Sequence, residues 1–381
     1  MEKTIGVLGG GQLGRMLALE ARHMGYRVLQ WTGGDRSGAE LLADEAIYGA
    51  FDDAKAKEEF LSKVDVVTVE FENIPRELVS EISESKPTYP SAEAIAICQD
   101  RELEKTFLKE NGIPTTPFRI VQNATELASA LEEIEGDVII KTAQFGYDGK
   151  GQLALPVENR PPVEEAWSQF EGVRAIVEKK VDLASELSVM VVRGRDGEML
   201  TYDPAENEHQ RHILHLSIVP ARLSAQLQEE ARQIAMQVVE KLDYVGVIGV
   251  EFFLNQDGEL LVNEMAPRPH NSGHHTLDAC ETSQFEQQLR AVAGLPLGST
   301  ALLKPVVMWN LLGDIWPSAD EMPDWSSVLS TSGAHLHLYG KQGAKAKRKM
   351  GHATFTAETV DEALSKAENC IASYPYQNHH A

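Results

Sequence analysis

Short apolar runs, a glycine-rich turn and a helical stretch alternate in the first part of the chain. Residues 4–8 predict a buried strand, and Arg15–Met24 has the spacing of an amphipathic helix. Arg27–Trp31 predicts a second strand and Val64–Glu70 another. This order is typical of a parallel sheet whose strands open onto a crevice at their carboxyl ends. The first unit is expected to close near residue 95.

The rest of the chain mixes helical and strand patterns. A helical pattern over residues 91–110 ends at Asn111-Gly112-Ile113-Pro114, and another helix is predicted over Ala225–Leu242. A last segment begins near Pro296 and ends with a helix at Val360–Ser373. Strands are predicted at Val138–Lys141, Ala175–Glu178, Leu187–Val192, Gly249–Leu254, Leu260–Asn263 and His335–Tyr339.

Composition narrows the class of protein. The 381 residues are enough for two or three packed units, and no apolar run approaches the length of a membrane span. The N-terminus has no signal segment, and three widely spaced cysteines indicate free thiols in a cytoplasmic protein. A formal charge of −23 argues against nucleic acid as a partner but not against an anionic small substrate.

The first glycine cluster, Gly9 to Gly14, fits the G-x-G-x-x-G pattern of dinucleotide-binding turns. An NAD site also needs an acidic residue at the end of the next strand, but that strand ends Leu29-Gln30-Trp31-Thr32. A plain strand-to-helix turn is a second reading. We favour a third, in which the N–H groups of the turn bind a substrate phosphate.

A second cluster, Gly146-Tyr147-Asp148-Gly149-Lys150-Gly151, combines an acid, a base and an aromatic residue. Such a loop can fold over a polyphosphate, with its N–H groups and Lys150 neutralising charge. The alternative is a plain hairpin loop.

Two carboxylates, Glu251 and Glu264, lie on neighbouring strand patterns joined by the turn 255–259. Antiparallel pairing would bring both, with Asn263, onto one face. These hard oxygen donors suit Mg²⁺ that bridges nucleotide phosphates. The alternative is two unrelated ion pairs.

The next segment, Ala266 to His275, is a loop rich in donors, and its Arg268 suits bidentate contacts with anions. Zinc binding by His270, His274 and His275 lacks a cysteine or acidic ligand at fitting spacing, so we expect no zinc.

Taken in order, these motifs resemble the ATP-grasp superfamily and, within it, the N5-carboxyaminoimidazole ribonucleotide synthetases. The likeness covers nearly the whole chain, and its most specific part is Arg268-Pro269-His270-Asn271-Ser272-Gly273-His274. It implies an α/β ATP-grasp fold with a Rossmann-like domain at 1–95, an ATP-grasp domain at 96–295 with a lid at about 105–180, and a small C-terminal domain at 296–381.

The resemblance also implies roles for individual residues. Glu251 and Glu264 would bind Mg²⁺, and Asp148, Lys150, Arg268, His270 and Asn271 would be catalytic. ATP would be bound by Arg101, Lys141, Gly146, Tyr147, Asp148, Gly149, Lys150, Gly151, Gln152, Glu178, Lys179, Lys180, Val181, Glu186, His209, Asn263 and Glu264. Aminoimidazole ribonucleotide would be bound by Gln12, Leu13, Glu72, Tyr147, Asp148, Arg268, His270, Asn271, Lys341, Arg348 and Lys349. Lys347 departs from the family, because a glycine is expected there.

The activity implied is carboxylation of the ribonucleotide's exocyclic amine with ATP and bicarbonate in purine biosynthesis. ATP would activate bicarbonate as carboxyphosphate, and either Asp148 or the departing phosphate would serve as base. The resemblance implies a cytoplasmic homodimer that needs Mg²⁺ but no biotin. The alternatives are a formate-dependent glycinamide ribonucleotide transformylase, a biotin carboxylase, an NAD-dependent oxidoreductase or a non-catalytic nucleotide-binding subunit.

Overall fold

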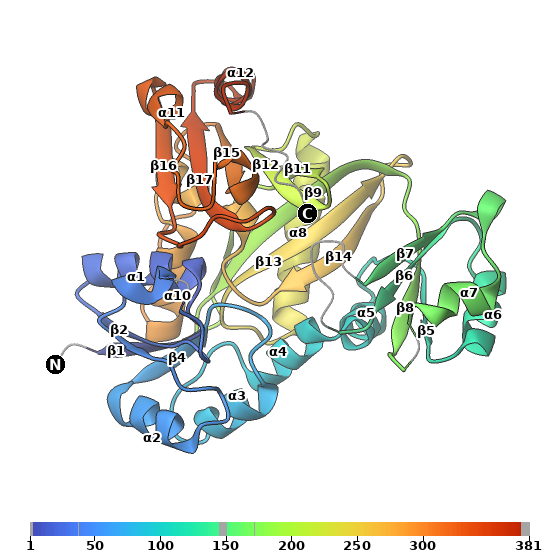
Figure 1. The fold of residues 1–381 in the computed structure, drawn as a ribbon, viewed down its shortest axis with the longest axis horizontal. Coiled ribbons are helices and arrows are strands. Elements are labelled where there is room, and N and C mark those ends of the chain that lie inside the picture. Colours follow the sequence, from blue (N-terminus) through green and yellow to red (C-terminus); the bar gives the residue numbers. More distant parts are fainter. Residues whose placement is uncertain (1–2, 37, 145–150, 171, 375–381) are drawn as a thin grey trace.

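A computed structural model describes residues 3–36, 38–144, 151–170 and 172–374 of the chain. It is a mixed α/β structure built on three sheets, as the sequence predicts. In Figure 1 the lid sheet projects away from the other two. No helix in the described ranges is both long and apolar enough to cross a membrane.

The N-terminal sheet is parallel, in the order β3-β2-β1-β4, and three helices accompany it. Trp31, Phe60, Val79 and Ile82 belong to one cluster of its hydrophobic core. The elements are β1 (Thr4–Leu8), α1 (Gln12–His23), β2 (Arg27–Trp31), η1 (Ala39–Leu42), β3 (Glu45–Ile47), α2 (Ala54–Lys63), β4 (Val66–Val69) and α3 (Arg76–Ser83).

The helical pattern at 91–110 forms two helices rather than one, α4 (Ala92–Gln99) and α5 (Arg101–Glu110). Asp100 separates them with an extended backbone, and its carboxylate accepts hydrogen bonds from the N–H groups of Glu102 and Leu103. Aspartate is a favoured N-cap residue, so a second helix starts there. The break turns Arg101 and Glu104 toward the cavity described below.

The lid is an antiparallel sheet in the order β5-β8-β6-β7, covered by two short helices (Figure 1). Its own core contains Leu127, Val138, Trp167 and Phe170. The elements are β5 (Phe118–Val121), α6 (Ala124–Glu133), β6 (Val138–Thr142), β7 (Gln152–Leu155), η2 (Val157–Asn159), α7 (Val163–Ser168) and β8 (Ala175–Lys179).

The third sheet is the largest and runs β14-β13-β9-β11-β12-β15-β17-β16, with β10 paired to β9. The C-terminal strands β15–β17 therefore continue the central sheet through the β12–β15 pairing. The strands are β9 (Leu183–Arg193), β10 (Met199–Thr201), β11 (Ala205–Gln210), β12 (Ile213–Val219), β13 (Gly246–Asn255), β14 (Leu260–Ala266), β15 (Val306–Leu312), β16 (Ala334–Leu338) and β17 (Lys349–Thr356).

Helix α10 connects this sheet to the N-terminal domain. Its residues Phe285, Leu289 and Val292 share one core cluster with Leu17 of α1. The helices are α8 (Ala225–Lys241), η3 (Asn271–Gly273), α9 (Thr276–Ala279), α10 (Gln284–Ala293), η4 (Gly313–Ile315), α11 (Ser326–Ser330) and α12 (Val360–Ile371).

Candidate active site

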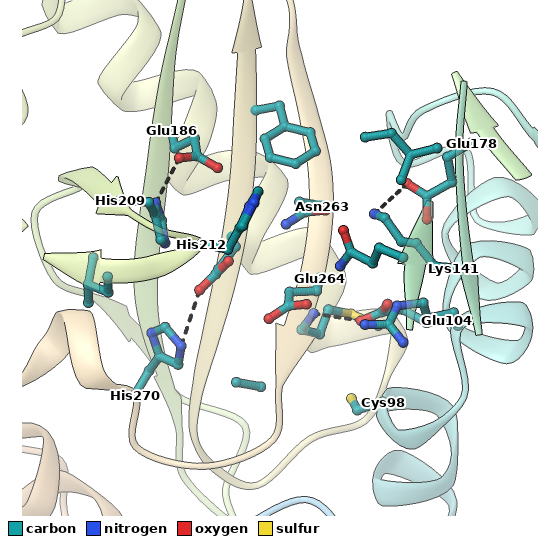
Figure 2. Close-up of a pocket in the computed structure, with 18 of the residues that line it drawn as sticks. Cys98, Glu104, Lys141, Glu178, Glu186, His209, His212, Asn263, Glu264 and His270 are labelled. Carbon is teal, nitrogen blue, oxygen red and sulfur yellow. Dashed lines mark hydrogen bonds and ion pairs between the residues drawn. The ribbon is translucent and has the colours of Figure 1, made fainter. Parts of the chain in front are cut away.

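A cavity of about 830 Å³ is lined by the lid, the central sheet and the N-terminal domain. Figure 2 shows Lys141 and Glu178 on its lid side and Glu186 and His209 on the opposite side. The predicted site residues that line it are Glu72, Arg101, Lys141, Gln152, Glu178, Lys179, Lys180, Val181, Glu186, His209, Glu251, Asn263, Glu264, Arg268, His270, Asn271 and Lys349.

The lid side carries a buried set of opposite charges. Lys141 on β6 donates to Glu178 on the neighbouring strand β8 at 3.1 Å, and Lys105 of α5 lies 3.8 Å from the same oxygen. Burial alone would raise the pKa of Glu178, but the charges of Lys105 and Lys141 outweigh it and lower the pKa to about 2. The other oxygen, Glu178 Oε1, is buried without a partner among the described residues and can accept a hydrogen bond from a ligand.

The acid pair lies on the predicted hairpin. Strands β13 and β14 are antiparallel, with a register shift between Val250 and Phe252, and Glu251, Asn263 and Glu264 all line the cavity. Burial and the nearby charge of Glu264 raise the pKa of Glu251 to about 8. A divalent cation would relieve this repulsion, so the pair and the amide oxygen of Asn263 fit Mg²⁺.

No group of three or more His, Cys, Asp or Glu side chains in the described ranges is arranged to hold a metal ion by itself. Oxygen ligands from nucleotide phosphates would therefore have to complete a Mg²⁺ site at the acid pair.

His209 and Glu186 form a pair on the far side of the cavity (Figure 2). Their side chains are 2.7 Å apart, from His209 Nδ1 to Glu186 Oε2. Burial tends to lower the pKa of His209, but its hydrogen bond to Glu186 and the charge of that carboxylate raise it overall.

The donor-rich loop is held in place by side chains from other elements. Arg268 donates to Glu72 of the N-terminal domain at 2.5 Å, and His270 Nε2 lies 3.2 Å from Glu251 Oε1. The side-chain amide of Gln284 accepts from the N–H of His270 and donates to its carbonyl, both at 2.9 Å. Burial, followed by the charges of Arg268 and Lys349, keeps the pKa of His270 well below its usual range.

The three histidines of this loop have separate partners. His274 Nδ1 contacts Gln284 Nε2 at 2.9 Å, and His275 Nδ1 contacts the carbonyl of Ser272 at 2.8 Å. Both rings are buried, whereas the His270 ring faces the cavity.

The basic segment 341–349 lies against the N-terminal domain. Lys341 donates to Gln12 Oε1 at 2.7 Å and to the carbonyl of Lys349 at 3.1 Å. Burial, then the charge of Arg348, lowers the pKa of Lys341 to about 8. Arg348 itself donates to the carbonyl of Gly343 at 2.8 Å. Gln12, Lys341 and Arg348 are not among the residues that line the cavity, whereas Lys349 is.

Lys347 has the left-handed backbone, φ 65°, for which a glycine was expected. Its N–H donates to the buried carboxylate of Asp314 at 2.6 Å. Lys347 thus adopts a backbone conformation that glycine takes more readily.

The N-terminal glycine turn departs from the prediction. The N–H groups of Gly11 and Gly14, the latter at 2.8 Å, donate to the buried carboxylate of Glu70. Glu70 therefore takes the anion position at the start of α1, so the expectation that these two groups bind a substrate phosphate is wrong. The Leu13 side chain is buried in the core, and only its backbone could meet a ligand.

The second glycine cluster lies mostly outside the described residues, which exclude Gly146, Tyr147, Asp148, Gly149 and Lys150. Gly151 has φ 68°, and a Cβ there would lie 2.8 Å from the Thr142 hydroxyl oxygen. Glycine is required at this position.

Several site residues were missed from the sequence. Glu104 and Cys98 line the cavity, as do Arg211 and His212 of the β11–β12 turn. Lys105 is buried beneath it and donates to Thr115 at 2.9 Å. A charged pair such as Glu104-Lys105 inside a helix gives no sequence signal of burial, because a solvated helix face has the same pattern.

Comparison with known proteins identifies the three parts. Residues 1–99 match the ribonucleotide synthetase preATP-grasp domain, 106–285 the ATP-grasp domain, and 306–366 the phosphoribosylaminoimidazole carboxylase C-terminal domain. The N5-carboxyaminoimidazole ribonucleotide synthase of Bacillus subtilis (strain 168) is 43% identical over 366 residues, which span 96% of this chain and 94% of that protein.

Solved structures agree. An ADP complex of an N5-carboxyaminoimidazole ribonucleotide synthetase is 42% identical, with a TM-score of 0.89, covering 97% of this chain and 96% of that one. The Aspergillus clavatus synthase in complex with ADP and 5-aminoimidazole ribonucleotide is 32% identical, with a TM-score of 0.87, covering 97% and 98%. The chain therefore belongs to the N5-carboxyaminoimidazole ribonucleotide synthase family of ATP-grasp ligases.

Proposed function

We propose that the cavity carries out the family's reaction with MgATP on its lid side and the aminoimidazole ribonucleotide on its N-terminal side. The enzyme carboxylates 5-aminoimidazole ribonucleotide with ATP in purine biosynthesis. The observation that carries this division is the charge of the cavity. The Lys141–Glu178 pair lies on the lid side, the Glu251–Glu264 acid pair lies on the central sheet, and Arg268 and Lys349 lie toward the N-terminal domain.

On the ATP side, Lys141 and Arg101 supply positive charge for phosphates, and Glu178 offers an unused acceptor for a donor group on the nucleotide. Glu186 and His209 are placed to contact the ribose. Glu251 and Glu264, with Asn263, would hold Mg²⁺, which would neutralise phosphate charge during phosphoryl transfer.

On the ribonucleotide side, Arg268 is oriented by Glu72, and Lys341 is oriented by Gln12. Together with Arg348 and Lys349 they form a cationic region suited to a phosphate monoester. Asn271 also lines the cavity, and its Nδ2 is buried without a partner in the part of the chain that the structure describes.

The chemistry follows from these placements. Bicarbonate attacks the γ-phosphorus of ATP, giving ADP and carboxyphosphate. The exocyclic amine then attacks the carboxyl carbon, or CO₂ released from it; phosphate leaves, and a proton leaves the nitrogen. Asp148 and the departing phosphate both remain candidates for the base. Exclusion of water from the cavity protects carboxyphosphate from hydrolysis.

The test is phosphate release from MgATP and bicarbonate with and without 5-aminoimidazole ribonucleotide. We expect strong stimulation by the ribonucleotide in the wild type and a roughly 10²–10³-fold loss of kcat in Glu264→Gln. Glu259→Gln, which removes an exposed carboxylate from the turn of the same hairpin, is the matched control. ATP turnover indifferent to the ribonucleotide would remove the substrate assignment.

Two further proposals rest on the family alone: a homodimer and a cytoplasmic location. Sedimentation equilibrium of the full chain tests the first, and a monomer at micromolar concentration would contradict it. Fractionation of the source cells tests the second.

A further inference from the structure

A line of buried polar side chains crosses the central sheet and ends at the cavity. Ser217 Oγ donates to Asn207 Oδ1 at 2.8 Å, and Asn207 Nδ2 donates to Ser188 Oγ at 2.9 Å. Ser188 Oγ donates to Ser272 Oγ at 2.7 Å. We call Ser217, Asn207, Ser188 and Ser272 the polar relay.

The relay ends at one nitrogen of the His270 ring, Nδ1, and Glu251 lies near the other nitrogen, Nε2. Ser272 Oγ is 2.9 Å from His270 Nδ1, and His270 Nε2 is 3.2 Å from Glu251 Oε1. Each member of the relay is less than a tenth exposed, so water does not compete for its hydrogen bonds. The ring of His270 thus has a polar neighbour at each nitrogen.

Hydrogen-bond chemistry gives the relay one direction. A carboxylate that binds a metal is ionised and only accepts, so His270 must turn an Nε2–H toward Glu251. In a neutral ring Nδ1 is then a bare acceptor, and the Ser272 hydroxyl must donate to it. Ser272 must in turn accept from Ser188, and Ser188 from the Asn207 amide. The donor directions from Asn207 to Ser188 and from Ser188 to Ser272 agree with this order, and the distances at the two His270 nitrogens allow the remaining links.

The backbone of His270 is fixed independently. Gln284 binds both its N–H and its carbonyl, and a Cβ on Gly249 would lie 2.8 Å from the His270 Cβ. Gly249, which has no Cβ, therefore lets the loop pack closely against β13, and the relay has only the ring orientation and the tautomer left to decide.

We propose that the polar relay sets the Nε2–H tautomer of His270, so that His270 holds one oxygen of Glu251 and leaves the other for the metal. Ser272, Ser188, Asn207 and Ser217 are positioning residues that act through His270, and this role rests on the proposed function of Glu251. His270 is one step removed from the metal ligand, and partners of that kind change metal affinity about 10–100-fold when lost.

The first test is the affinity of the protein for Mn²⁺ in the presence of ADP, measured by electron paramagnetic resonance. We expect Ser272→Ala to weaken Mn²⁺ binding about tenfold and Ser188→Ala to weaken it about threefold. The loss should fall with distance along the relay. Thr354→Val is the matched control, because it removes a fully buried hydroxyl that bonds Asp278, away from the cavity, and should leave Mn²⁺ binding unchanged.

The second test reads the tautomer directly. In ¹⁵N-histidine-labelled protein saturated with Mg²⁺ and ADP, with the His270 signals assigned by their absence in His270→Asn, we expect Nε2 to carry the proton in the wild type and both tautomers in Ser272→Ala. If Ser272→Ala does not fold, both measurements are made on Ser188→Ala.

Unchanged Mn²⁺ affinity and an unchanged tautomer in both serine variants would overturn the proposal. So would an equal loss in Thr354→Val. Neither test needs the ribonucleotide, so failure of the carboxylation assay would remove the proposed function without affecting them.

Discussion

The two sides of the cavity treat their buried carboxylates in opposite ways. Glu178 on the lid side lies between Lys105 and Lys141, and its pKa falls to about 2. Glu251 on the sheet side lies near Glu264, and its pKa rises to about 8. Both carboxylates sit on strands at the edge of one cavity, so the difference is the counter-charge that the chain supplies.

On the lid side, the positive charges of Lys105 and Lys141 balance the carboxylate of Glu178 before any ligand binds. At the acid pair, the charges of His209 and Lys349 do not offset burial and the charge of Glu264 at Glu251, and we propose that Mg²⁺ supplies the missing positive charge. The comparison predicts that removing charge from the two sides will have opposite effects on stability.

The largest expected effect is on the lid side. Lys105→Met should lower the free energy of unfolding by about 3–5 kcal/mol, because it removes one of the cations that balance Glu178 and also a donor to Thr115. Glu251→Gln should leave stability unchanged or raise it, because it removes a repulsion. Guanidinium unfolding of both variants, monitored by circular dichroism, provides the measurement.

The control is Lys57→Met. Lys57 pairs with Glu81 at 2.5 Å on the surface, and such pairs contribute about 0–1 kcal/mol. A Lys105→Met variant that loses no more than Lys57→Met would show that the buried pair is not what distinguishes the lid side.

The acid pair can be predicted from the sequence, but the buried charges of the lid side cannot. The Glu251–Glu264 hairpin is visible because both acids interrupt apolar strands on either side of one turn. Lys105 is not visible, since its partners Thr115 and Glu178 come together only through tertiary packing.

The same limit explains the glycine turn. Its N–H groups predict an anion, but the sequence cannot tell whether the anion is a substrate phosphate or a carboxylate of the chain itself. Glu70 follows β4 directly, at the carboxyl end of the strand beside β1, and reaches the turn from there. Local patterns thus gave the elements and the acid pair, whereas pairings far apart in the sequence required the structure.

A third region of the molecule contains buried histidines. His274 and His352 have ring centroids 4.9 Å apart, and burial holds the pKa of each well below its usual range. The unfolded chain binds protons near pH 6.5 whereas the folded chain does not. Their stabilising contribution is therefore complete above about pH 6.5 and falls by about 1.4 kcal/mol per pH unit for each histidine below it.

His352→Asn removes one of these groups, and the dependence of its stability on pH between about 5 and 6.5 should be shallower than that of the wild type by about one proton. Glu104 and Glu251 act with the opposite sign there, because their pKa values are raised to about 8. The measurement therefore uses the difference between variant and wild type in the slope of stability against pH. Equal slopes for the variant and the wild type would contradict the prediction.

The smallest expected effect concerns backbone strain beside the acid pair. Arg211 and His212 join β11 to β12 with φ of 53° and 65°, a turn for which Asn-Gly is the favoured sequence. The double variant Arg211→Asn/His212→Gly should gain about 1 kcal/mol of stability, less what is lost with the 3.8 Å contact between Arg211 and Asp314. Thermal unfolding measures it.

Gly258→Ala is the matched control for this strain, because Gly258 has φ 84° and a Cβ there would meet no atom within 4 Å. It should lose about 1 kcal/mol from the backbone alone. If Gly258→Ala loses stability and the double variant gains none, the Arg211-His212 turn is compensated by contacts in the cavity. The strained backbone would then be maintained by contacts in the cavity and would not be a cost of the hairpin alone. Backbone strain of this kind is found where side chains are held over a ligand.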